Sequence, residues 1–238
     1  MRYARQELLD DFKHSTKLLH EKRVGIIGVG GLGGLCSLLL VGAGVTHLKI
    51  SDSDDIALTN LHRQLLFREN DVGKLKTKIT KEQLISLDKS AQIECFLKIT
   101  RDNFDAFAQD LDLILDLSDN VETRLLINEL CLKHKKDLIH CSVGAYRGIL
   151  MAYLFSDANY VDKYGCYQCI CGAISPISVQ GILGPCASTM SSNCAQLALQ
   201  ILNGNKDVAG NMYLYDLKNF KIQKMALTKD QGCTCCNQ

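Results

Sequence analysis

The segment VGIIGVGGLG at residues 24–33 decides the fold of this chain. Its apolar start has the composition of a short buried strand, and residues 32–41 have the length and composition of a helix. Gly28, Gly30 and Gly33 fit the pattern GxGxxG at the junction of the two elements. Such glycines allow a tight turn whose N–H groups approach a phosphate, and the helix N-terminus adds partial positive charge. The segment therefore predicts a nucleotide-binding α/β fold.

Strands and helices are predicted to alternate outward from this segment. The residues favour strands at 47–51, 92–98, 113–116 and 137–141, and helices at 74–87, 104–108 and 121–133. Beyond Gly144 the pattern changes to longer strands at 148–155, 211–217 and 220–227, with a helix at 188–202. This order predicts an α/β fold: a Rossmann-like, mostly parallel sheet with flanking helices and C-terminal antiparallel strands.

The domain organisation follows from the absence of any repeat, low-complexity segment or linker in the sequence. We expect residues 1–238 to form a single domain, because a chain of 238 residues that is 47% hydrophobic can build one large core. Residues 1–144 are predicted to form its nucleotide-binding half. Residues 145–238 form a second half with a loop rich in cysteine and glycine, which holds Pro176 and Pro185.

Charge and hydropathy exclude several classes of partner. The 27 Lys and Arg residues against 26 Asp and Glu give a net charge of +1 without a basic run, so nucleic acid is not expected to bind. The N-terminus is charged and lacks the apolar core of a secretory signal, which predicts a cytoplasmic protein. The longest apolar stretch, residues 28–45, is broken by glycines, so no membrane span is expected.

Asp52 is the acidic partner of the glycine loop. It ends the strand that follows the predicted helix, where a carboxylate can accept hydrogen bonds from ribose hydroxyls. The same combination of glycine loop and acidic residue serves nicotinamide-dependent dehydrogenases and several ATP-using enzymes. It predicts a nucleotide but does not choose which one.

Further polar and charged residues recur where the predicted elements begin and end. In chain order they are Arg5, Gln6, Asn60, Arg63, Gln64, Lys76, Ser118, Asp119, Asn120 and Arg124. In this order, together with Asp52 and the glycine loop, they resemble the ThiF/MoeB/HesA family, whose members are related to ubiquitin-activating enzymes. The similarity covers nearly the whole chain.

This resemblance implies an activity and a partner. The implied reaction is ATP-dependent adenylation of the C-terminal glycine carboxylate of a small ubiquitin-like sulfur carrier of the ThiS or MoaD type, with release of pyrophosphate. The carrier is expected to end in Gly-Gly and to bind the half formed by residues 145–238. Thiamine biosynthesis, molybdenum cofactor biosynthesis and modification of a peptide remain open as pathways. A homodimer is implied because Arg5 reaches the ATP site of a neighbouring subunit in this family.

The resemblance also implies the residues of the ATP site. By this resemblance Asp52 binds ribose, Asn60, Arg63 and Lys76 contact phosphates, and Asp119 positions Mg²⁺. The remaining residues expected to bind the nucleotide are Gly28, Gly30, Gly33, Gln64 and Asn120. Catalysis is expected to depend on Arg63, Lys76, Asp119 and Arg5.

The chemistry of adenylation accounts for such residues. An enzyme that transfers AMP to a carboxylate must orient the α-phosphate and neutralise charge on the departing pyrophosphate. Arg63 and Lys76 are predicted to lie beyond strand ends, and Asp119 projects at the same edge, where Mg²⁺ is held by a few carboxylates and phosphate oxygens. Asp54, Asp55 and Asp116 are weaker candidates. His62 is left unassigned, because the attacking carboxylate is already ionised near neutral pH.

Two CxxC pairs, Cys166/Cys169 and Cys233/Cys236, predict a zinc site. Each pair aims two thiolates at one point, and four protein ligands are typical of structural zinc. Family members that resemble this chain carry the same pairs. Redox dithiols are the alternative, which we do not favour because neither pair is expected to open a helix in a thioredoxin-like unit. Cys235 is an alternative ligand in the second pair.

A covalent step is a separate question. Relatives carry a further cysteine in the loop after the first CxxC pair, and that thiol links to the carrier protein. The matching place in this chain is Ile177 or Ser178, and Cys171 and Cys186 are possible substitutes. The expectation is therefore limited to adenylation. The competing hypotheses are a nicotinamide-dependent oxidoreductase, an adenylyltransferase acting on a peptide, and a zinc-stabilised scaffold without activity.

Overall fold

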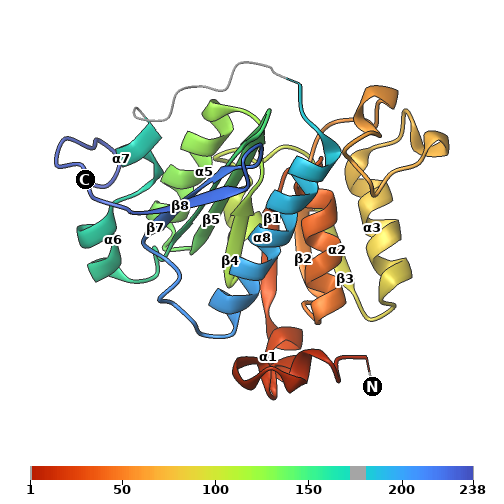
Figure 1. The fold of residues 1–238 in the computed structure, drawn as a ribbon, viewed down its shortest axis with the longest axis horizontal. Helices are drawn as coiled ribbons and strands as arrows, with labels where there is room; N and C mark the ends of the chain where they lie inside the picture. The colour runs from red at the N-terminus through yellow and green to blue at the C-terminus, as the bar shows by residue number, and fades with distance from the viewer. Residues whose placement is uncertain (1, 172–180, 238) are drawn as a thin grey trace.

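The structure is a computed structural model that describes residues 2–171 and 181–237 (Figure 1). Its centre is an eight-stranded sheet in the order β3-β2-β1-β4-β5-β6-β7-β8. The first five strands of this order pair in parallel: β3 (Gln92–Phe96), β2 (His47–Ser51), β1 (Arg23–Ile27), β4 (Leu113–Asp116) and β5 (Leu138–Gly144). The chain reverses its direction of travel across the sheet between β1 and β4, which is where open α/β sheets bind ligands.

Three antiparallel strands extend the sheet beyond β5. They are β6 (Arg147–Tyr153), β7 (Asn211–Asp216) and β8 (Lys221–Ala226). The predicted mostly parallel sheet with C-terminal antiparallel strands is therefore confirmed. All six residues of β8 are exposed, so this strand forms a free edge in the described chain.

Helices cover both faces of the sheet, as predicted. On one face α2 (Gly33–Ala43) contacts α3 (Lys76–Leu87) and α8 (Gly184–Leu202). Consecutive residues of β1 face opposite sides of the sheet. Ile26 faces α2, because a Cβ on Gly33 would lie 3.4 Å from it. Gly25 faces α4 (Phe104–Ala108), because a Cβ on Gly25 would meet Phe107. The long helix α5 (Val121–Lys133) contacts β4 and β5.

Several short elements were not predicted. The N-terminal segment forms two 3₁₀ turns (Gln6–Leu8 and Asp10–Phe12) and α1 (Ser15–Glu21), and further 3₁₀ turns span Leu58–Asn60 and Glu69–Asp71. The cysteine-rich segment contains α6 (Ala158–Tyr164) and α7 (Tyr167–Cys171), so the prediction of a loop there is wrong. Elements of three to seven residues show little helical period in sequence, although the equally short α4 was predicted.

Helix α8 begins four residues earlier than predicted, at Gly184 instead of Ser188. Pro185 therefore lies in its first turn and not in a loop. Proline is tolerated there because the first N–H groups of a helix have no intrahelical partner. Among the helices of residues 2–171 and 181–237, none combines the length and apolar character needed to cross a bilayer.

Candidate functional site

A cavity of about 890 Å³ opens at the C-terminal ends of β1 and β4. It lies at the switch in strand order, as expected for a ligand site in this fold. The predicted residues that line it are Gly28, Gly30, Asp52, Arg63, Gln64, Lys76, Asp119 and Asn120. The structure therefore brings eight of the predicted site residues to one cavity, although they come from five separate parts of the chain.

The glycine loop can carry no side chains at its two ends. Gly28 has φ of 88°, and a Cβ there would lie 2.9 Å from the carbonyl oxygen of Leu117. A Cβ on Gly33 would lie only 1.9 Å from the carbonyl oxygen of Gly28. The backbone is thus packed too closely for any other residue, and the loop leads directly into the N-terminus of α2. This arrangement fits a bound phosphate group.

Lys76 is buried in a network of two carboxylates. Its ammonium group lies 2.6 Å from Asp54 and 3.9 Å from Asp52, and its side chain is only 7% exposed. Asp52 also accepts a hydrogen bond of 2.9 Å from the backbone N–H of Val29 in the glycine loop. Burial raises the pKa of Asp52, and the hydrogen bonds and Lys76 partly oppose it. Asp54, a weaker candidate in sequence, is the closest partner of the buried lysine.

Arg63 and Gln64 pack against the glycine loop. The Arg63 guanidinium donates to the carbonyl oxygen of Thr59 at 3.1 Å, which directs the side chain along the turn. Gln64 is 5% exposed, yet its Oε1 accepts no hydrogen bond from the described residues. A buried acceptor without a partner costs free energy, and a ligand bound in the cavity would offset this cost if it donated a hydrogen bond to Gln64 Oε1.

Asp119 lies in the turn between β4 and α5. Its exposed carboxylate lines the cavity and accepts a hydrogen bond of 3.4 Å from Asn120. Asn120 is also the N-cap of α5, because its side-chain oxygen accepts from the N–H of Thr123 at 2.8 Å. One exposed carboxylate at this cavity fits Mg²⁺, because Mg²⁺ takes most of its ligands from water and phosphate oxygens. Asn120 has a clear role in stabilising the turn.

His140 lines the cavity and forms a buried pair with Asp116. Asp116 was only a weaker candidate in the sequence, and His140 was not predicted as a site residue. The two residues are opposite each other on β4 and β5, and His140 Nδ1 lies 3.2 Å from Asp116 Oδ2. Burial lowers the pKa of His140, whereas the pKa of Asp116 is lowered because its hydrogen bonds outweigh its burial. In this arrangement Nδ1 of His140 is placed to donate to the Asp116 carboxylate. Sequence spacing contains no signal for this pair, since it depends on strand register.

Some predicted residues do not reach the cavity. Asn60 accepts from the N–H of Ala57 at 3.1 Å within its own turn and is not among the lining residues. His62 is exposed and contacts Thr59. Arg5 is exposed in the N-terminal segment, which lies at the opposite end of the parallel strands from the cavity (Figure 1). Any role of Arg5 at an ATP site therefore requires a second copy of the chain.

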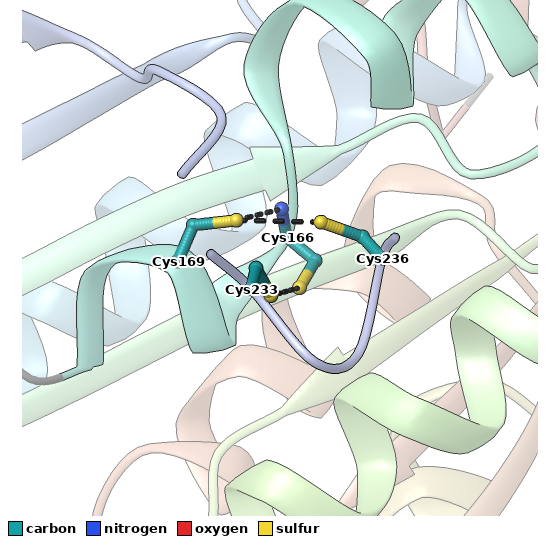
Figure 2. Close-up of side chains that lie close together, drawn as sticks. All are labelled: Cys166, Cys169, Cys233 and Cys236. Carbon is teal, nitrogen blue, oxygen red and sulfur yellow. Dashed lines mark hydrogen bonds between the residues drawn. The ribbon is translucent and has the colours of Figure 1, made fainter. Parts of the chain in front are cut away.

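The four predicted zinc ligands lie together in space (Figure 2). The sulfur atoms of Cys166, Cys169, Cys233 and Cys236 are all within 4.8 Å of one another. Cys166 and Cys233 are 3.8 Å apart at sulfur, and Cys169 and Cys236 are 3.4 Å apart. Tetrahedral zinc with Zn–S bonds of about 2.3 Å places its sulfurs roughly 3.8 Å apart. The donor set and spacing therefore fit zinc.

Cys235 lies beside this cluster but outside it. Its sulfur accepts a hydrogen bond of 3.4 Å from the side chain of Asn128, a buried residue of α5. The hydrogen bond from the Cys235 thiol, together with weaker effects, lowers the pKa of Cys166 to about 5, which favours the thiolate that a metal needs. The choice of Cys233 and Cys236 over Cys235 thus agrees with the geometry.

The cysteine cluster and the cavity share helix α7. Cys166 directly precedes this helix, whose first residue, Tyr167, and last residue, Cys171, line the cavity. Although Cys166 directly precedes α7, this helix is not part of a thioredoxin-like strand-helix-strand unit, in line with the expectation. Cys186 is buried in the first turn of α8. Ile177 and Ser178, the predicted place of a covalent cysteine in relatives, lie outside the described residues.

Comparison with known proteins gives the following relatives. The model of the ThiF family matches residues 3–235. The chain is 33% identical to the sulfur carrier protein ThiS adenylyltransferase of Escherichia coli (strain K12), over 99% of this chain and 94% of that protein. It is 28% identical to the sulfur carrier protein adenylyltransferase of Thermus thermophilus, over 99% and 90%. It is 32% identical to the adenylyltransferase and sulfurtransferase MOCS3 of Culex quinquefasciatus, of which it spans 55%.

Solved structures resemble the fold across the whole chain. A crystal structure of E. coli MccB with ATP has a TM-score of 0.83 and 20% identity, covering 100% of this chain and 75% of that one. MccB with AMPCPP and MccA has a TM-score of 0.82 and 21% identity, covering 99% and 74%. At this level of identity the likeness establishes the fold alone.

Proposed function

This chain belongs to the ThiF family, and we propose that it uses ATP to adenylate the C-terminal carboxylate of a small sulfur-carrier protein. Relatives similar over nearly their full length are named sulfur carrier adenylyltransferases, which supports both the enzyme class and the kind of substrate. The relatives named MOCS3 indicate the same adenylation chemistry in longer proteins. Nothing in the comparisons supports a nicotinamide-dependent oxidoreductase.

The observation that carries the proposal is the convergence of Arg63, Lys76 and Asp119 on the cavity of the glycine loop. Two cations and a carboxylate suit a triphosphate with its metal, whereas hydride transfer has no use for them. With the β- and γ-phosphates near Arg63 and Lys76, the α-phosphate remains accessible to an acyl oxygen. Gln64 Oε1 then accepts a hydrogen bond from the nucleotide or from a water molecule bound to it.

The residues of the site act by binding and orientation. Asp52 accepts from ribose hydroxyls, and the N–H groups of the glycine loop donate to phosphate oxygens. Arg63 and Lys76 stabilise the charge that collects on pyrophosphate as the carrier carboxylate attacks the α-phosphate. Asp119 holds Mg²⁺, which when bound neutralises part of the phosphate charge. The attacking carboxylate needs no base, so His62 has no part in this step.

The cysteine cluster serves as a structural zinc site in this proposal. Its four thiols leave no position for substrate or water, which is typical of structural zinc. Cys166 and Cys169 belong to the segment around α7, whereas Cys233 and Cys236 belong to the last turn of the described chain. Zinc would therefore tie the C-terminal segment to the wall of the cavity.

Three finer points belong to the same proposal. The half formed by residues 145–238 binds the carrier, whose tail ends in Gly-Gly because glycine passes most easily through a narrow channel. The enzyme acts as a homodimer in the cytoplasm. Arg5 completes the ATP site of the second subunit, because the N-terminal segment that carries it lies at the other end of the parallel strands from the cavity (Figure 1).

Pyrophosphate exchange into ATP tests the proposal. The purified chain with a carrier of the ThiS or MoaD type should catalyse exchange, and a carrier that lacks its last glycine should not. Arg63→Ala and Asp119→Ala should abolish exchange. Arg68→Ala is the control for Arg63, because Arg68 is exposed on the same loop and does not line the cavity. Normal exchange in both site variants would refute the assigned roles.

A further inference from the structure

We propose that His140 is a positioning residue for the metal-binding turn of the proposed ATP site. The inference rests on the proposed function, because it concerns how Asp119 is held for Mg²⁺. His140 is 2% exposed, lines the cavity and contacts Asp116, which is 1% exposed. Two polar side chains this deeply buried need a structural or chemical reason, since burial without full pairing costs free energy.

Asp116 connects His140 to the turn that carries Asp119. Its Oδ2 accepts the Nδ1–H of His140, and its Oδ1 accepts both the N–H and the hydroxyl of Ser118, at 3.1 and 2.6 Å. Ser118 is the residue directly before Asp119. The Asp116 carboxylate therefore bonds to His140 on the sheet and to Ser118 in the turn, and it fixes the position of the turn relative to the sheet.

A second contact holds the same turn from outside. The guanidinium of Arg124 donates to the carbonyl oxygen of Ser118 at 2.9 Å from Nη2 and at 3.3 Å from Nε. Asn120 caps α5, so the residues before and after Asp119 are both anchored. Among the described residues, the Asp119 carboxylate itself accepts only the long hydrogen bond from Asn120, which leaves it available to a metal. Only its backbone is held in place.

The far side of His140 is packed against α7. The ring of Tyr167 lies 4.7 Å from the His140 ring, centroid to centroid, and the N–H of Tyr167 is held by Asn128 at 2.9 Å. This contact blocks rotation of the imidazole away from Asp116. Outer groups that orient a metal ligand typically change metal affinity by about 10- to 100-fold when they are removed. His140 is such a group for Mg²⁺ at Asp119.

The test is the Mg²⁺ concentration that half-saturates ATP binding, measured by calorimetry, alongside ATP affinity in EDTA. His140→Leu removes the N–H donor and should raise the Mg²⁺ requirement about tenfold, while ATP affinity in EDTA changes less than about twofold. His140→Asn places an amide N–H near the position of Nδ1 and should restore the Mg²⁺ requirement to within about twofold of the parent. An unchanged requirement in His140→Leu, or no rescue in His140→Asn, would overturn the inference.

His134→Leu is the control, because His134 also contacts a carboxylate, 3.0 Å from Asp105, and does not line the cavity. An equal effect in His134→Leu would also overturn the inference.

A second variant tests the network if circular dichroism shows that His140→Leu does not fold. Ser118→Ala removes one hydrogen bond to Asp116 at a half-buried position. It should raise the Mg²⁺ requirement about threefold, and no change would refute the role of the network. A parent protein that binds no ATP at any Mg²⁺ concentration would instead refute the proposed function.

Discussion

The nucleotide cavity and the cysteine cluster are held in place by different means. The cavity is formed by loops at the ends of parallel strands, and its polar groups come from positions between Gly28 and Tyr167. The cluster is formed by two short segments that meet only through their thiols and neighbouring contacts. The sheet therefore holds the residues of the cavity in place, whereas the geometry of the cysteine cluster depends on a metal bound between its sulfur atoms. The two regions should respond differently to substitution and to loss of metal.

The largest expected effect is on the cavity. Gly33→Ala forces a Cβ to within 1.9 Å of the Gly28 carbonyl oxygen, so the loop must move and ATP affinity should fall at least about 100-fold in a calorimetric titration. Gly42→Ala is the control in the same helix, because a Cβ there meets nothing within 4 Å. It should leave ATP binding intact and stabilise the protein by about 0.5–1 kcal/mol. Similar losses in both variants would contradict a specific role of the loop.

The second prediction concerns two neighbouring thiols, one inside the cluster and one outside. Cys236→Ala removes one of four sulfurs and should abolish stoichiometric zinc, measured by elemental analysis, and lower the unfolding temperature. Cys235→Ala keeps all four and should retain zinc, with an affinity reduced about tenfold in competition with a chelator, because the contact to Cys166 and the hydrogen bond from Asn128 are lost but no ligand is. Loss of zinc in Cys235→Ala but not in Cys236→Ala would reverse the ligand assignment.

Removal of metal gives the third and more moderate effect. A chelator should lower the stability of the parent protein while the glycine loop stays folded, since the sheet holds it. ATP affinity should fall by about two- to tenfold, because α7 carries Tyr167 at the cavity wall. Hydrogen exchange of the backbone tests this directly: exchange should rise around α7 and stay low in β1. Equal exchange at both places would remove the distinction between the two regions.

The smallest effect is a pH dependence that belongs to His140. Its pKa is lowered by burial, so the folded state binds fewer protons than the unfolded state below the ordinary histidine pKa of about 6.5. The stability that this residue contributes is complete above that pH and declines as the pH falls toward the lowered pKa. The unfolding temperature should therefore drop more between pH 7 and 5 in the parent than in His140→Asn. Equal drops would show that His140 does not titrate in this way.

Much of the sheet could be predicted because its signals are local. The apolar runs of β1 and β4 and the glycine loop are contiguous in sequence, and Leu113–Asp116 and Val121–Lys133 have the predicted bounds. Helix α7 was missed because its five residues were assigned to the loop rich in cysteine and glycine, whereas the equally short α4 was predicted. The cysteine ligands were found from spacing alone, because CxxC brings two thiols together in any compact turn.

The contacts within the site were less accessible to sequence reasoning. Lys76 was predicted as a cation for phosphate, but its pairing with Asp54 depends on how the loop folds back. The pair Asp116 and His140 depends on the register between β4 and β5, which a single sequence does not contain. Gln64 is predicted as a ligand, and its lack of a hydrogen-bond partner becomes visible only when its surroundings are known.

The ion pairs of Lys76 have a consequence for turnover. In this structure the ammonium group is already neutralised by Asp52 and Asp54. On the proposed function, a triphosphate that binds Lys76 would displace the Asp54 carboxylate, which is largely exposed and can turn toward water. When pyrophosphate leaves, the same carboxylate would return to Lys76. Asp54 competes in the same way with both anions, so the further contacts of the ribose and base would be what favours the nucleotide over pyrophosphate.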